Sequence, residues 1–202
     1  MVESFVDEIA AAGGKDPLEL RRILLANAKD PGWLKVLNDV ADKGGWGKKT
    51  LPRGTAQGLA IAIDHSSIVA AVAQVSVSQT GGVKVERVDL SFDLGHVINP
   101  QGVEQQMMSS VIYALNEALN EEITFRNGRV VEGNFDDYPM MRIEDAPLVV
   151  SHFGGLTGGE KFTGAGECAV SVTGGAVCNA IFKVTGKRVR SLPVRHHDLS
   201  WS

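Results

Sequence analysis

The stretch "IVAAVAQVSVSQTGGVKVERVDLSFDLG", residues 68–95, consists of two β-rich runs separated by a glycine turn. Apolar and polar residues alternate along 73–78, which is the period of a strand with one buried face. "QTGG" at 79–82 has the composition of a hairpin turn. The apolar phase of the second run switches after Val85, so we expect a β-bulge near residues 86–87. The stretch therefore predicts an antiparallel hairpin whose second strand is bulged.

Helical patterns precede this hairpin. Glycine or Asp-Pro pairs separate three expected N-terminal helices, at residues 4–12, 17–29 and 33–42. A glycine-rich linker follows the third helix, and the apolar run at 58–63 predicts a short buried strand. The second helix is expected to bury Leu20, Ile23, Leu24 and Ala28.

The residues after the hairpin predict a second set of elements. They are a long helix at 101–120, a small hairpin around 127–128, a strand at 146–153, a helix after Glu167 and an edge strand at 188–194. Together the patterns predict an α+β fold, in which N-terminal helices are followed by a mixed β-sheet packed with two long helices. We expect a helical segment at 1–45 and a single lobe at 58–202.

Composition and charge exclude several classes of partner. The chain has 202 residues, 44% of them hydrophobic, and a formal net charge of −4 without a basic run, which argues against nucleic acid and anionic membranes as main partners. No apolar run is long enough to span a bilayer. The N-terminal stretch carries acidic residues and does not have the basic region of a signal peptide. The cytoplasm and the periplasm both remain open as the compartment.

Residues that commonly bind metals are few and poorly spaced. Cys168 and Cys178 are ten apart and form no Cys-x-x-Cys pair, so the chain encodes neither a zinc knuckle nor a cysteine-ligated iron–sulfur site. The histidines do not pair with a carboxylate on one helical face, and we expect them to be solvated. These histidines are His65, His96, His196 and His197.

The glycine-rich stretch "GGLTGGEKFTGAGE", residues 154–167, raises two nucleotide-binding alternatives. Gly154 and Gly159 have the spacing of a P-loop, but Glu160 stands where that motif requires lysine. "GAGECA" at 164–169 fits a dinucleotide-binding fingerprint formally, but a strand does not directly precede it and the expected acid does not follow. Both interpretations are therefore disfavoured.

Two polar residues have both a structural and a functional interpretation. Glu167 follows bare glycine backbone at the expected start of a helix, where a carboxylate either stabilises the helix dipole or faces a ligand. Gln106 lies on the long helix beside Ser109 and Ser110, and is either solvated or bonded to a partner. Local physics alone does not separate these interpretations.

Five segments in this order resemble one family. They are "ESFVDEIAAAGGKDPLELRRILL" at 3–25, "DLGHVINPQGVEQQ" at 93–106, "ALNEALNEEITFRNGRVVEGNFDDYPMMR" at 114–142, "GAGE" at 164–167 and "CNAIFKVTGKRVRSLP" at 178–193. They resemble the C-terminal part of the molybdopterin-binding large subunit of the xanthine oxidase and aldehyde oxidase family. The isoquinoline 1-oxidoreductase beta-subunit type is the most similar branch.

The resemblance implies a function, a cofactor and partners. It implies that Glu167 is the catalytic base beside molybdenum, and that Gln106 together with Gly164, Ala165 and Gly166 contacts the cofactor; no residue of this chain binds the metal directly. The implied cofactor is molybdopterin cytosine dinucleotide, shared with the remaining part of the molybdenum subunit. A small partner subunit with [2Fe–2S] clusters, through which electrons would leave, is also implied. The implied reaction is hydroxylation of an aldehyde or N-heteroaromatic carbon, with water as the oxygen source.

The sequence also departs from this family. Ser109 and Ser110 replace a glycine pair and would add atoms near the cofactor, Cys168 replaces a proline, and the chain matches only the C-terminal part of the longer subunits. We therefore expect the isolated chain to be inactive. The alternative hypothesis is a non-catalytic remnant or assembly lobe of such a complex.

Overall fold

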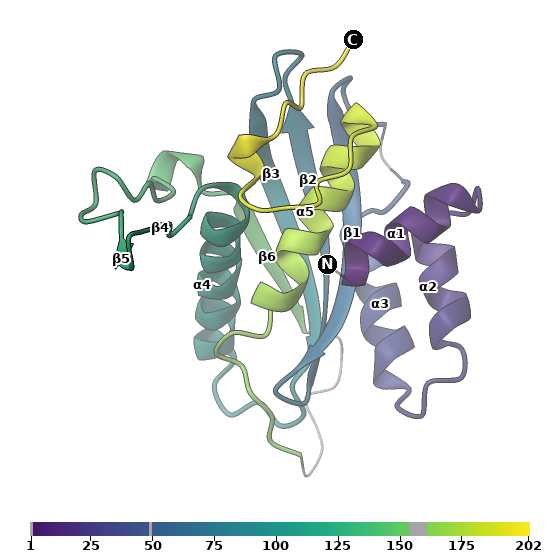
Figure 1. The fold of residues 1–202 in the computed structure, drawn as a ribbon. Helices are drawn as coiled ribbons and strands as arrows, with labels where there is room; N and C mark the ends of the chain where they lie inside the picture. Colours follow the sequence, from purple (N-terminus) through teal and green to yellow (C-terminus); the bar gives the residue numbers. More distant parts are fainter. Residues whose placement is uncertain (1, 49, 154–160) are drawn as a thin grey trace.

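The computed structural model describes residues 2–48, 50–153 and 161–202 and shows helices on both sides of one four-stranded sheet (Figure 1). The P-loop spacing of Gly154 and Gly159, noted in the sequence, lies outside the described residues. The helices and strands of the main body are α1 (Val2–Ala12), α2 (Pro17–Leu25), α3 (Gly32–Lys43), β1 (Thr55–Asp64), β2 (Ser67–Val77), β3 (Val83–Asp93), α4 (Pro100–Leu119), β6 (Leu148–Phe153) and α5 (Val170–Thr185).

The sheet has the order β1-β2-β3-β6 and is mixed, as the sequence predicts. The first three strands are antiparallel, whereas β6 pairs parallel to β3 after the crossover through α4. The register of β2 against β3 shifts between Gln74 and Val75, because Glu86 is left without a partner residue. This confirms the predicted bulge, which lets the apolar side chains on both sides of it face the same core.

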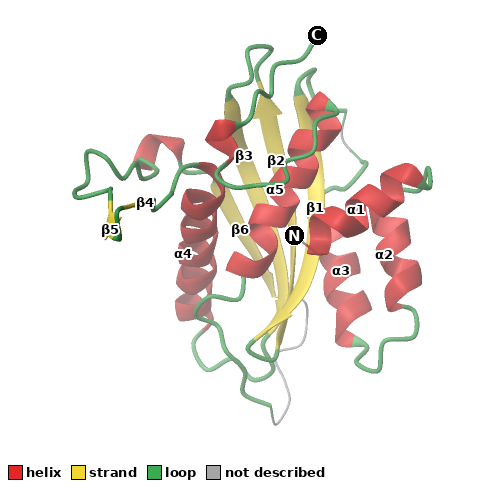
Figure 2. Cartoon of the chain, viewed as in Figure 1, coloured by secondary structure: helices red, strands yellow, loops and turns green. Residues whose placement is uncertain are grey.

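The larger of two hydrophobic cores lies between the sheet and the two long helices α4 and α5 (Figure 2). Strand β3 contributes Val88, Leu90 and Phe92 to it, and α4 contributes Met107 and Val111. The opposite face of the sheet is covered by α3, whose Val36, Leu37 and Val40 form the second core with residues of β1 and β2.

An arm leaves the body between α4 and β6, and Figure 1 shows it projecting away from the sheet. It contains the short hairpin of β4 (Phe125–Arg126) and β5 (Arg129–Val130), and the 3₁₀ turn η1 (Ile143–Asp145). Asn127 and Gly128 both have positive φ, which confirms the predicted two-residue hairpin turn. The body holds the arm at its base, where the Asn116 side chain accepts a hydrogen bond from the Met141 amide at 2.5 Å.

Two sequence predictions about the elements are wrong. Residues 188–194 do not form an edge strand; they run as an irregular segment that leads into the 3₁₀ turn η2 (Val194–His196). Ion pairs between side chains hold this segment in place of strand pairing. Arg188 binds Asp7 of α1, and Arg190 binds Glu8 of the same helix.

The buried face of α2 is the second error. The helix ends at Leu25, before the predicted stop, and it buries Leu18 and Arg21 while Ile23 and Leu24 are exposed. Arg21 can be buried because its guanidinium is paired with Glu3 and bonded to two backbone carbonyl oxygens.

Among the described residues, no helix combines the length and the apolar character needed to cross a bilayer.

Candidate functional site

The chain between β6 and α5 contains the sequence Gly-Ala-Gly-Glu, residues 164–167, here called the glutamate turn. The hydroxyl of Ser110 on α4 is buried beneath it and shares its proton between two carbonyl oxygens, of Gln106 at 2.8 Å and of Gly166 at 3.0 Å. The turn that carries Glu167 and the helix that carries Gln106 are therefore joined through one side chain. The sequence predicted each of these residues separately, and the structure brings their segments together.

A second buried hydroxyl holds the other end of the glutamate turn. Ser67, the first residue of β2, donates to the carbonyl oxygen of Gly164 at 2.5 Å and lies 2.8 Å from the hydroxyl of Thr163. The Gly164 amide in turn donates to the carbonyl oxygen of His65 in the tight turn between β1 and β2. The turn is therefore attached to the sheet and to α4 by separate contacts.

The two glycines of the turn have different surroundings. A Cβ at Gly164 would lie 2.7 Å from the Cβ of His65, so only glycine fits this close approach without a shift. A Cβ at Gly166 would meet nothing within 4 Å. The packing of this chain therefore explains Gly164, whereas the space beside Gly166 is open on the side of the turn next to Glu167.

Glu167 is exposed and lies just before α5 rather than in its first helical turn. Its carbonyl oxygen accepts a hydrogen bond from the Val170 amide at 2.9 Å, which forms the turn into the helix. Gln106 is also exposed, on α4. Neither side chain is used by the fold in a hydrogen bond or ion pair between described residues, so both remain free to contact another group.

The carboxylate of Glu167 acts electrostatically on α4. Partial burial raises the pKa of Glu117, and the negative charges of Glu121 and Glu167 act in the same direction. Glu117 and the first helical residues Val170 and Ser171 line a mostly apolar cavity of about 600 Å³ between α1, α4, α5 and residues 188–192. Glu117 therefore belongs to the lining of this cavity and is also affected by the charge of Glu167.

The cysteine after Glu167 is a packing residue. Cys168 is buried, and its sulfur lies 3.8 Å from the sulfur of Met107 on α4. Burial raises the pKa of the Cys168 thiol to about 11, and the same cause raises the pKa of Cys178 to about 11. Neither thiol is therefore a nucleophile at neutral pH.

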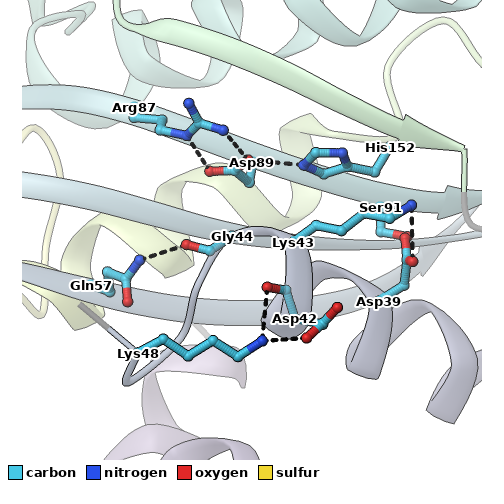
Figure 3. A network of polar contacts seen from close by, with 10 residues as sticks. All are labelled: Asp39, Asp42, Lys43, Gly44, Lys48, Gln57, Arg87, Asp89, Ser91 and His152. Atoms are coloured by element: carbon cyan, nitrogen blue, oxygen red, sulfur yellow. Dashed lines mark hydrogen bonds and ion pairs between the residues drawn. The ribbon is translucent and has the colours of Figure 1, made fainter.

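The α3 face of the sheet carries a polar network that the sequence analysis did not single out (Figure 3). Asp89 of β3 is buried, accepts two hydrogen bonds from Arg87 at 2.6 and 2.7 Å, and lies 2.9 Å from Nε2 of His152 on β6. Ser91 donates to Asp39 of α3 at 2.7 Å. The signal was present in the sequence, because the alternation along β3 places 87, 89 and 91 on one face.

This network lies on the face of the sheet opposite the glutamate turn and satisfies its own charges, so we assign it to the packing of α3 and β6. No group of three or more His, Cys, Asp or Glu residues within the described part of the chain is arranged to hold a metal ion. Of the histidines named from the sequence, His65 pairs with the adjacent Asp64, and His196 lies 3.2 Å from a carboxylate oxygen of Glu122.

Comparison with known proteins shows the family. The model of the molybdopterin cofactor-binding domain matches residues 39–147, which include Gln106 but not Glu167. The membrane-bound aldehyde dehydrogenase [pyrroloquinoline-quinone] of Gluconacetobacter polyoxogenes is 35% identical over 98% of this chain and 28% of its own length. The isoquinoline 1-oxidoreductase subunit beta of Brevundimonas diminuta is 32% identical over 96% of this chain and 25% of its own. The chain thus spans about a quarter of these relatives.

The fold is also found in solved structures. Quinoline 2-oxidoreductase from Pseudomonas putida 86 superposes with a TM-score of 0.56 over 63% of this chain and 17% of that chain, at 23% sequence identity. At this identity the similarity shows the α+β fold alone. Because the domain model covers more than half of the chain and the relatives align with nearly all of it, the chain belongs to the molybdopterin-binding family of xanthine oxidase-type enzymes.

Proposed function

We propose that this chain supplies the catalytic base and part of the cofactor wall of a molybdenum hydroxylase large subunit. The proposed reaction inserts oxygen from water at an aldehyde or N-heteroaromatic carbon. The observation that supports it most directly is the Ser110 hydroxyl, which bonds the carbonyl oxygens of both Gln106 and Gly166. This contact joins α4, which carries Gln106, to the turn that carries Glu167, and so supports the proposal.

The residues present fit a bound molybdopterin. The open space beside Gly166 leaves room for a bulky group, and the exposed Gln106 amide offers both a donor and an acceptor to its polar atoms. Gly164, Ala165 and Gly166 present backbone rather than long side chains, which permits close approach. Gln106, these three residues and Glu167 are therefore our proposed contacts on this chain.

The chemistry divides between the cofactor and the protein. When bound, the molybdenum centre supplies the two-electron redox chemistry that the protein side chains lack. Glu167 acts as general base, taking a proton from the attacking water oxygen through its exposed carboxylate. Among the described residues no hydrogen bond or ion pair engages this exposed carboxylate, so it is free to contact the water.

The proposed partners are the remaining part of the molybdenum subunit and a small [2Fe–2S] subunit that removes electrons. The arm supports an extensive interface, because Phe125, Phe135 and Ile143 expose 73%, 83% and 92% of their surface. Apolar side chains that are exposed together on one projecting segment mark a contact surface. The chain spans only about a quarter of its relatives, and we propose that protein corresponding to the rest of their length covers the arm.

Cofactor analysis of the assembled complex tests this proposal. The chain would be co-expressed with the neighbouring reading frames, and the purified complex assayed for molybdenum and for cytidine monophosphate released by acid. We expect both, in a ratio near one per complex. A folded complex without molybdenum would support the non-catalytic assembly lobe, and pyrroloquinoline quinone in its place would contradict the proposed cofactor.

A further inference from the structure

We infer that Ser67 and Ser110 are positioning residues, which fix the glutamate turn from its two ends so that Glu167 keeps a constant relation to α4. This inference rests on the proposed function for its consequence in catalysis. The contacts themselves are independent of any cofactor. Ser67 and Ser110 are 0% and 2% exposed, and their hydroxyls bond Gly164 and Gly166, the two glycines of the turn.

The need for such contacts follows from the backbone of the turn. Residues 163–169 belong to neither a strand nor a helix, so no regular ladder holds them. Glycine backbone is also the most costly to immobilise. In the described structure, the Gly164 and Gly166 carbonyl oxygens have these two serine hydroxyls as their only hydrogen-bond donors. Removing either hydroxyl leaves one carbonyl oxygen without its donor.

The arrangement also gives Ser110 a role within this chain. Its side chain does not extend into the open space beside Gly166; it is buried between α4 and the turn. Ser109, by contrast, is exposed. The serine pair therefore divides into one residue that ties the turn to α4 and one surface residue.

Two backbone amides report on the two contacts separately. The Val170 amide donates to the carbonyl oxygen of Glu167, next to the Ser110 contact. The Gly164 amide donates to His65, next to the Ser67 contact. Hydrogen exchange at these amides in the 202-residue chain therefore measures how firmly each end of the turn is held.

Ser110→Ala should accelerate exchange at Val170 by about fivefold, the effect of losing one buried hydrogen bond, and Ser67→Ala should do the same at Gly164. Ser109→Ala controls for a substitution on the same helix. Ser91→Ala controls for loss of a buried hydroxyl, because Ser91 bonds Asp39 on the opposite face of the sheet. Neither control should change exchange at either amide. Unchanged exchange in both test variants would overturn the inference.

The catalytic consequence is measured in the assembled complex. Ser110→Ala should lower kcat with an unchanged KM and unchanged molybdenum content, and Ser110→Thr, which retains the hydroxyl, should restore much of the rate. Faster exchange with an unaltered kcat would show that the contact is only structural and would overturn the positioning role. A complex that contains no molybdenum would contradict the proposed function, while the exchange measurement would still decide whether the serines hold the turn.

Discussion

Arg21 of α2 is buried against Glu3 of α1, with 2.8 Å between Arg21 Nε and Glu3 Oε2. The same carboxylate oxygen accepts a hydrogen bond from the backbone amide of Ile61 in β1 at 2.8 Å. A single ion pair thereby connects two N-terminal helices to the edge strand of the sheet. The first helices also contact α5, because Asn179 of α5 donates a hydrogen bond to the backbone carbonyl oxygen of Glu3.

Arg21→Ala should lower the free energy of unfolding by about 3–5 kcal/mol, because it leaves the largely buried carboxylate of Glu3, 13% exposed, without its cation. Arg22→Ala is the matched control. The Arg22 side chain is 40% exposed, pairs with Glu19 on the same helix and donates one hydrogen bond to Asn38 of α3, so its loss should cost only about 1 kcal/mol. Urea unfolding of the two variants measures the difference, and equal effects would contradict the importance of the buried pair.

Alanine substitutions at the two glycines of the turn should affect different properties, the stability of the chain at Gly164 and the molybdenum loading of the complex at Gly166. Gly164→Ala should destabilise the chain by about 1–3 kcal/mol, because the new methyl group would overlap His65. Gly166→Ala should leave the stability of the chain almost unchanged and reduce molybdenum loading of the complex, because the methyl group enters the space proposed for the cofactor. Thermal unfolding and metal analysis separate the two effects. Normal molybdenum loading of the complex with Gly166→Ala would contradict the proposal that the cofactor occupies that space.

The pH dependence of stability should reflect Glu117. Because its pKa is raised in the folded chain, the folded state binds more protons than the unfolded state at pH values just above 4.5. Its contribution to stability therefore falls as the pH rises from there through the raised pKa. Glu117→Gln should be more stable than the parent at neutral pH, and this advantage should vanish at low pH.

Asp198 provides a control of opposite sign. Hydrogen bonds from Ser200, together with Lys187, lower the pKa of Asp198 to about 2. Its contribution is present above the ordinary aspartate pKa and is lost as the pH falls toward 2, so Asp198→Asn should lose stability at neutral pH and match the parent in strong acid. Urea unfolding at several pH values measures the stability of both variants relative to the parent. The same pH dependence of this difference for Glu117→Gln and Asp198→Asn would contradict the opposite pKa shifts assigned to the two residues.

Neither cysteine should react readily in the folded chain. With the pKa of each thiol near 11, roughly one molecule in a thousand carries a thiolate at pH 8, and both side chains are buried. We expect slow labelling by a thiol reagent under native conditions and rapid labelling of both thiols in denaturant. Rapid native labelling of Cys168 would show that the residues after Glu167 are not packed against α4.

Local patterns in the sequence predicted most of the elements. The phase switch after Val85 located the bulge, and the Asn127–Gly128 pair located the small hairpin, because both depend on neighbouring residues. The buried face of α2 was predicted wrongly since Arg21 depends on Glu3, which lies in another helix. The prediction of an edge strand at 188–194 was wrong for a similar reason, because salt bridges to α1 determine the conformation of this segment.

The candidate site shows the same limit. Glu167 and Gln106 were named from motifs, but the sequence does not reveal that Ser110 joins their segments. Nor does it distinguish Gly164, which the fold requires, from Gly166, which it does not. These distinctions depend on contacts between residues far apart in the chain, which only the folded structure supplies.

The most direct test of the account is the rate of the assembled complex with Glu167 replaced by glutamine. This change keeps the size of the side chain and removes its ability to accept a proton at neutral pH. We predict that Glu167→Gln retains molybdenum and cytosine dinucleotide at the parent level and loses at least about a hundredfold in kcat. A loaded variant that turns over aldehyde or N-heteroaromatic substrates at the parent rate would contradict the assignment of Glu167 as the base.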